Sequence, residues 1–183
     1  MRHLAKWTLC GLSLAAILAV SVAFAARSGG PTHNDFGRDY SKENGFSFMP
    51  PKGWFKMAST PAGTFASYTD PKSPEGFVTN MNVSVAPADK ASIDTAVAEA
   101  KKAMAAAYKD YKSVQSGSFT INGRKVANVS GQFTMGGSAV QNMQYFIEGG
   151  SKKIYSMTFT SLQTAFEANR TIFETCALTA LAD

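Results

Sequence analysis

The chain has 183 residues, of which 45% are hydrophobic and 17% are charged, and this length and composition suit one domain with its own core. The formal net charge is +5, and the Lys and Arg residues are scattered, with no cluster longer than a pair. This pattern excludes the broad basic surface that nucleic-acid-binding proteins present.

Residues 1–25 have the pattern of an export signal. Arg2 and Lys6 form a basic start, an apolar stretch follows, and Ala23-Phe24-Ala25 fits the small-x-small rule for cleavage before Ala26. Cys10 lies near the start of the apolar stretch, which is the wrong place for a lipoprotein cysteine. We therefore expect a periplasmic or secreted protein without a membrane span after cleavage. The alternative is an uncleaved anchor, because an apolar stretch of roughly 18 residues is at the lower limit for spanning a bilayer.

Cleavage would leave Cys176 as the single thiol. No intramolecular disulfide is then possible, although an exported protein meets an oxidising compartment. Residues 26–43 are rich in Gly, Ser, Asn and charge, which predicts a flexible tether. The expected organisation is a signal peptide (1–25), a tether (26–43) and a single domain (44–183).

The first part of this domain predicts short strands at residues 45–49, 55–57, 64–69 and 79–86. Pro50-Pro51 ends the first strand, and a loop with two prolines, residues 70–76, follows the third. In the fourth strand Met81, Val83 and Val85 are expected to point inward.

A helix is predicted next. Ser92 is a suitable N-cap and Asp94 complements the positive end of the helix. A stripe at three- and four-residue spacing is mostly small, which allows close packing on a sheet: Ile93, Val97, Ala100, Met104 and Tyr108.

Residues 124–161 predict an antiparallel meander, because three runs alternate between apolar and polar side chains. The apolar sets are Ala127, Val129, Phe133 and Met135, then Met143, Tyr145 and Ile147, then Tyr155, Met157 and Phe159. Gly136-Gly137 and Gly149-Gly150 separate the runs and are expected to take the positive φ angles of tight hairpins. A strand containing Phe119 and Ile121 enters the meander through Asn122-Gly123.

The chain is expected to end in a helix over residues 164–181 that closes the core. Its apolar face would carry Leu162, Phe166, Phe173 and Cys176.

Four segments resemble the PsbP-like superfamily in their order and spacing. They are Gly45-Phe46-Ser47-Phe48, Pro51-x-Gly53-Trp54, Tyr68-x-Asp70-Pro71 and Asn82-Val83-Ser84-Val85. The superfamily includes the extrinsic PsbP protein of photosystem II, bacterial periplasmic DcrB-like proteins and a Ran-binding nuclear transport factor. The resemblance implies an α+β fold, an α/β/α sandwich around a mainly antiparallel sheet. The resemblance implies no catalytic residues in this chain. The export signal has neither twin arginines nor the form of a transit peptide, which favours the DcrB-like group over a photosynthetic subunit.

No residue pattern indicates catalysis, a metal site or a cofactor. After cleavage the single histidine, His33, lies in the expected tether, which argues against a catalytic triad or a zinc site. Cys176 lies on the apolar face of the last helix, as an inert buried thiol would. We therefore expect no enzyme activity.

One outward strand face is expected to be neutral and polar, where exposed sheets usually carry Lys and Glu. Its members are Asn80, Asn82, Ser84, Asn128, Ser130, Gln132, Asn142, Gln144, Ser156, Thr158 and Thr160. Cover by the Ala-rich helix is the favoured explanation, and contact with a ligand or partner is the alternative.

The segment between Lys52 and Phe77 is the candidate partner-binding site. It gathers Trp54, Tyr68, Asp70, Lys72, Glu75 and Phe77 on turns and proline-braced loops. Trp54 fits two interpretations equally, a contact residue or a plug at the end of the core.

We expect a non-enzymatic exported envelope protein that acts by binding another protein, whose identity the sequence does not indicate. One alternative is a carrier of a small ligand in a cavity between sheet and helix. The other is an extrinsic photosystem II subunit of the PsbP type.

Overall fold

The computed structural model describes residues 32–33, 37–87, 92–150 and 152–183. The expected signal peptide and residues 26–31 and 34–36 of the expected tether lie outside the described residues.

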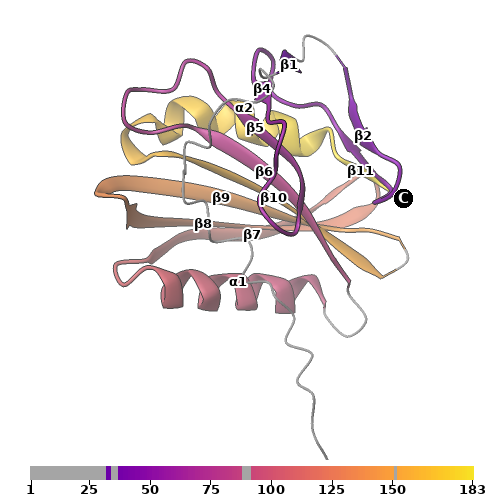
Figure 1. The fold of residues 1–183 in the computed structure, drawn as a ribbon. Helices are drawn as coiled ribbons and strands as arrows, with labels where there is room; N and C mark the ends of the chain where they lie inside the picture. Colours follow the sequence, from indigo (N-terminus) through magenta and orange to yellow (C-terminus); the bar gives the residue numbers. More distant parts are fainter. Residues whose placement is uncertain (1–31, 34–36, 88–91, 151) are drawn as a thin grey trace, which may run out of the picture.

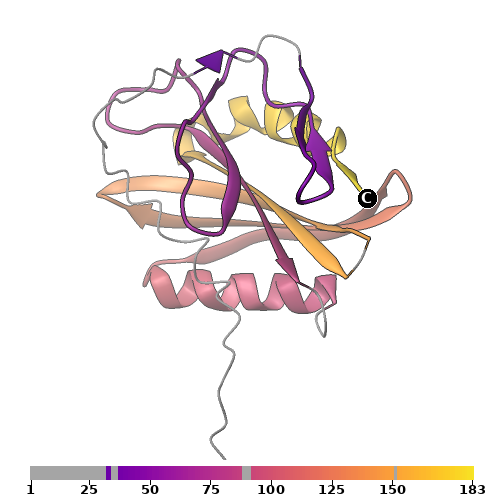
Figure 2. The ribbon, with the colours of Figure 1, turned by 45° about the vertical axis from the view of Figure 1, so that its right-hand side comes forward.

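The described part of the chain forms three layers (Figure 1). The middle layer is an antiparallel sheet with the strand order β1 (Thr32–His33), β4 (Phe55–Lys56), β5 (Thr64–Thr69), β6 (Asn80–Pro87), β10 (Lys153–Leu162), β9 (Ser138–Glu148), β8 (Arg124–Met135) and β7 (Lys112–Ile121). Helix α1 (Ile93–Ala107) packs on β8 and β9, and helix α2 (Phe166–Leu178) packs on β9 and β10 from the opposite face (Figure 2). This architecture confirms the expected α+β sandwich.

A second, three-stranded sheet joins the two ends of the domain. Its order is β11 (Leu181–Ala182), β3 (Phe46–Phe48) and β2 (Asp39–Ser41). Strand β2 corrects the expected tether, because residues 37–43 belong to the folded domain. The Asp39 carboxylate accepts a hydrogen bond from the Tyr68 hydroxyl at 2.6 Å and pairs with Lys56 at 2.7 Å. A three-residue strand is too short to show an apolar period, so the sequence pattern did not reveal it.

The meander is confirmed as β8, β9 and β10, and Asn122-Gly123 and Gly136-Gly137 have the expected positive φ angles. In the third turn, however, Lys152 has the positive φ of 54°, and the two glycines do not. Gly149 is needed there for space, because the Tyr155 ring lies where its side chain would be. The Gly150 amide donates to the carbonyl oxygen of Asp183.

Helix α1 begins as predicted, with the Ser92 hydroxyl accepting the Thr95 amide at 3.2 Å. Its buried residues are Ile93, Ala96, Ala100 and Met104. Because these side chains are mostly small, the helix axis can approach β8 and β9 closely.

The closing helix is shorter than predicted. A turn of 3₁₀ helix, η2 (Gln163–Ala165), precedes α2, and the chain leaves the helix after Leu178 to form β11. Phe166, Phe173 and Cys176 are buried against the sheet as predicted. Leu162 instead ends β10 and packs with a cluster on the α1 side. None of the described helices is long and apolar enough to cross a membrane.

Both faces of the central strands are buried, and this divides the expected polar face. The register pairs Asn128 with Tyr145 and Ser130 with Met143, so these β8 residues face α2. Gln132 lies on the same face as its partner Gln141. The other expected members belong to β6, β9 and β10 and face α1: Asn80, Asn82, Ser84, Asn142, Gln144, Ser156, Thr158 and Thr160. Apolar residues of β8, Ala127 and Val129, face α1 instead.

Cys176 is buried in the α2 interface, with its thiol 3.6 Å from the Met81 sulfur, and burial raises the pKa of the thiol. We expect slow labelling by a thiol reagent in native buffer and fast labelling in denaturant. Cys176→Ser should lower the free energy of unfolding by about 1 to 3 kcal/mol, because it buries a hydroxyl among apolar groups. Cys176→Ala is the control, because it removes the sulfur atom without adding a hydroxyl. Fast labelling of the folded protein would contradict this placement.

Candidate functional site

Neutral hydrogen-bonding side chains form two rows across three central strands, on the face of the sheet that carries α1. The register places Asn82, Thr158 and Gln144 side by side on β6, β10 and β9. The second row, Asn80, Thr160 and Asn142, lies one pleat along on the same face. These six side chains form the floor of a hollow, which we call the polar hollow.

Most of the amides in the polar hollow are hydrogen bonded. The Asn82 carbonyl oxygen accepts the Ser67 hydroxyl at 2.6 Å, and the Asn82 amide nitrogen donates to Asn80 at 3.3 Å. Asn142 accepts the Gly131 amide at 3.1 Å. The exception is the Oε1 atom of Gln144, which has no hydrogen-bond partner although the residue is only 1% exposed. Buried acceptors in native proteins are almost always paired with protein or water, and the hollow leaves room for such a donor next to Gln144.

The walls of the polar hollow are apolar. They come from the C-terminal end of α1 and from the end of β8: Met104, Tyr108, Phe133 and Met135. The cavity volume is about 20 Å³, and the hollow is partly open to solvent. A space of this size holds one or two water molecules, or the tip of one inserted side chain.

The loop over residues 70–77, the proline loop, borders the polar hollow. Phe77 is buried in a cluster with Met104 and Phe133, two of the wall residues. Asp70 holds the loop by accepting the Lys72 amide at 2.9 Å, and the Ser73 hydroxyl accepts the Thr79 amide at 2.9 Å. These bonds leave the side chains of Lys72 and Glu75 exposed on an ordered loop.

The structure separates the six sequence-predicted site residues. Trp54 and Tyr68 are buried in the core between the sheet and α2, while Phe77 is buried on the α1 side. No aromatic patch is therefore exposed at these positions. Asp70, Lys72 and Glu75 remain together on the proline loop, and only this part of the candidate site reaches the surface.

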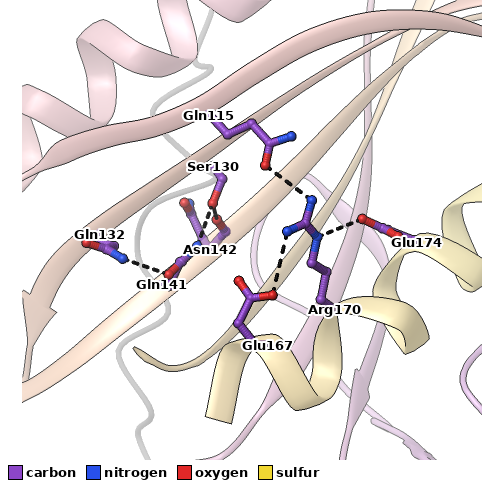
Figure 3. A network of polar contacts seen from close by, with 8 residues as sticks. All are labelled: Gln115, Ser130, Gln132, Gln141, Asn142, Glu167, Arg170 and Glu174. Atoms are coloured by element: carbon purple, nitrogen blue, oxygen red, sulfur yellow. Dashed lines mark hydrogen bonds and ion pairs between the residues drawn. The ribbon is translucent and has the colours of Figure 1, made fainter. Parts of the chain in front are cut away.

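A second polar network lies on the face that carries α2 (Figure 3). The Gln132 amide donates to Gln141 at 2.9 Å, and Gln141 donates to the Ser130 hydroxyl at 3.0 Å. Arg170 pairs with Glu174 at 2.9 Å and with Glu167 at 3.6 Å. The hydrogen bond to Glu174 raises the pKa of the Arg170 guanidinium. The Ser130 hydroxyl also donates to the backbone oxygen of Asn142 at 2.8 Å, so this network adjoins the floor of the polar hollow through β9.

The polar hollow can donate and accept hydrogen bonds. The one titratable group among its lining residues is the Tyr108 phenol, and burial raises its pKa. Among the residues that the structure describes, no three His, Cys, Asp or Glu side chains are grouped as a metal site requires. The arrangement suits recognition of a hydrogen-bonding group.

Sequence reasoning found the floor residues but missed the walls. Tyr108 and Met104 fit the helix pattern, and Met135 fits the strand pattern, so each has an ordinary role in the core. Only the packing of α1 against the sheet shows that they lie around the same space.

No protein-family model matches this chain, and no curated protein matches it. Several solved structures do match this chain. The cyanobacterial PsbP protein (CyanoP) from Synechocystis sp. PCC 6803 is 12% identical, with a TM-score of 0.65 over 86% of this chain and 98% of its own. The Ran-binding protein Mog1p of Saccharomyces cerevisiae is 7% identical, with a TM-score of 0.59 over 82% of this chain and 96% of its own.

A third similar structure is LpqN of Mycobacterium tuberculosis, described as involved in cell envelope biogenesis. It is 8% identical, with a TM-score of 0.53 over 82% of this chain and 88% of its own. The chain therefore has a PsbP-like fold. Such low identities show the fold alone.

Proposed function

We propose that this chain is a non-enzymatic, exported envelope protein that binds another protein at the proline loop and the polar hollow. The export signal predicted at residues 1–25 supports the location, and the periplasmic DcrB-like proteins are the group that we propose as nearest in type. Mog1p is described as Ran-binding, which agrees with a binding role, and LpqN is described as involved in cell envelope biogenesis, which agrees with the location.

The observation that carries the proposal is the buried, unpaired Oε1 atom of Gln144 at the floor of an open hollow. A donor from a partner would satisfy this atom. The cavity of about 20 Å³ favours the tip of a side chain over a free metabolite, because ligand pockets are usually far larger. The exposed Lys72 and Glu75 would contact the partner at the rim.

Site-specific photocrosslinking in the native envelope tests the location of the surface. A photoreactive amino acid at position 72 or 75 is expected to give one discrete adduct. The same group at Thr171, which is exposed on α2 on the other side of the sheet, is expected to give none. Equal labelling from all three positions would contradict the proposal.

Competition by purified variants tests the role of Gln144. Gln144→Leu should compete for the adduct about tenfold more weakly than the unmodified protein, because it removes one hydrogen bond to the partner. Its stability should be unchanged or higher, because the buried acceptor is replaced by an apolar group. Ser156→Ala is the matched control, since Ser156 Oγ is also buried and unpaired on this face but does not line the hollow. Equal competition by both variants would contradict the proposed role.

A further inference from the structure

Strand β7 forms one edge of the large sheet, and among the described residues no strand pairs with its outer side. It is the longest stretch of exposed strand in the described chain, because nine of its ten residues are exposed and only Ile121 is buried. The opposite edge is β1, which has two residues. Open strand edges pair readily with other strands unless charge, proline or a bulge prevents it.

The features of β7 that would hinder pairing with another strand lie only in its first residues. Lys112 is its one charged residue, and the register against β8 shifts between Ser113 and Gln115. From Gln115 to Ile121 the strand has no charge, no proline and no further irregularity. The apolar Phe119 is 37% exposed in this segment. The last seven residues of the edge are therefore open to pairing.

The hairpin determines which backbone groups of β7 point outward. Asn122-Gly123 is a two-residue turn closed by Ile121 and Arg124, and such a closing pair is hydrogen bonded. Because hydrogen-bonded pairs alternate with non-bonded pairs, Phe119, Gly117 and Gln115 also bond to β8. The amides and carbonyls of Ser116, Ser118 and Thr120 consequently point away from the sheet.

This outward set is complementary to itself. If a second β7 lies antiparallel with Ser118 opposite Ser118, then Ser116 of each copy lies opposite Thr120 of the other, and every outward group finds a partner. In the same register Phe119 of each copy lies opposite Gly117 of the other, on the face that carries α2. An aromatic ring over a cross-strand glycine stabilises the pair, because it covers backbone that glycine leaves open.

Strand β7 is paired with β8 along its length, and three side-chain contacts link it to its neighbours on both faces. On the α1 side, Lys101 donates to the Ser116 hydroxyl at 3.1 Å. On the α2 side, Gln115 accepts from Arg170 at 3.5 Å (Figure 3). The Phe119 ring rests edge-on against Tyr145 at 6.5 Å between centroids. A strand fixed on both faces loses little conformational entropy when it pairs.

We propose that this chain forms a symmetric dimer in which the β7 edges of two copies pair antiparallel about a two-fold axis at Ser118, joining the two large sheets. The surface differs from the proline loop and the polar hollow, so the dimer does not depend on the proposed function. A second copy is the occupant because the outward backbone groups pair with themselves in this register, Phe119 meets Gly117, and residues 115–121 include no charged side chain that would repel its copy.

The test is sedimentation equilibrium of the purified, exported protein over a range of concentrations. The unmodified protein is expected to show a reversible monomer–dimer equilibrium. Ser118→Lys and Ser118→Glu should each raise the dimer dissociation constant at least tenfold, because two like charges would then face each other across the axis. An equimolar mixture of the two variants should recover the dimer, since opposite charges then meet. Recovery separates loss of pairing from loss of folding.

Ser113→Lys is the matched control. It places the same charge on the same exposed strand but before the register shift, and it should leave the dissociation constant unchanged. Three outcomes would overturn the proposal: a monomer at all concentrations, a dimer that neither Ser118 variant weakens, or a variant mixture that stays monomeric. If the protein is monomeric at all concentrations, an extended segment of another protein becomes the candidate partner of the β7 edge.

Discussion

Replacing Trp54 by alanine is expected to lower the free energy of unfolding by about 3 to 5 kcal/mol. Trp54 is only 3% exposed, and its ring meets the Phe173 ring edge-on at 6.3 Å between centroids. Phe173 is itself fully buried and stacks on Phe159. Removing the indole would leave a cavity between α2 and the sheet at a place where rigid aromatic neighbours cannot close it.

Chemical denaturation followed by far-UV circular dichroism measures this loss. Trp54→Phe should cost less than Trp54→Ala, because it keeps an aromatic edge against Phe173. Lys72→Ala is the control on the exposed proline loop and should leave the denaturation midpoint unchanged. A loss below about 1 kcal/mol for Trp54→Ala would contradict the core position and favour a contact role.

Replacing Asp39 by alanine is expected to lower the free energy of unfolding by about 1 to 3 kcal/mol, although the sequence pattern places this residue in a tether. Its carboxylate accepts the hydroxyl of the buried Tyr68 and pairs with Lys56. The Asp39 side chain is 14% exposed and the Lys56 side chain is 39% exposed, so solvent screens the ion pair, and the hydrogen bond to the buried Tyr68 carries most of the effect. The substitution removes the counter-charge of Lys56 and the acceptor of Tyr68 together.

Asp94→Ala is the matched control for this prediction. Asp94 pairs with Lys125 at 2.8 Å, nearly the same distance as the Asp39 pair, but its side chain is 71% exposed. Exposed pairs contribute little, and Asp94 adds a carboxylate to the first turn of α1, so this variant should change stability by no more than about 1 kcal/mol. Similar small losses for both variants would show that residues 37–43 contribute little to the fold and would restore the expected tether.

These two positions show where sequence reasoning was sufficient and where it was not. A tryptophan next to a turn suits a core plug and a contact residue equally, and its burial depends on α2, which comes more than a hundred residues later. Asp39 lies in a polar segment without apolar periodicity. Its partners Lys56 and Tyr68 are distant in sequence, and only folding brings them near.

The sequence alone determined the features that depend on local order. The period-two runs and the Asn122-Gly123 and Gly136-Gly137 turns predicted the meander, because alternation and positive φ are properties of neighbouring residues. Ser92 and the stripe after it predicted α1. The burial of Cys176 followed from the apolar face of the last helix.

Only the tertiary structure decided which face of the sheet each polar residue joined. A strand has the same alternation whichever way it is turned, so its period cannot say which neighbour it faces. The register of β8 against β9 turned Asn128 and Ser130 toward α2, and the register of β10 between β6 and β9 gathered Gln144 and Thr158 into the polar hollow. Because helices cover both faces of the central strands, each of these strands needs apolar residues on both sides, and the distribution of polar residues between the faces is determined only when the strands pair.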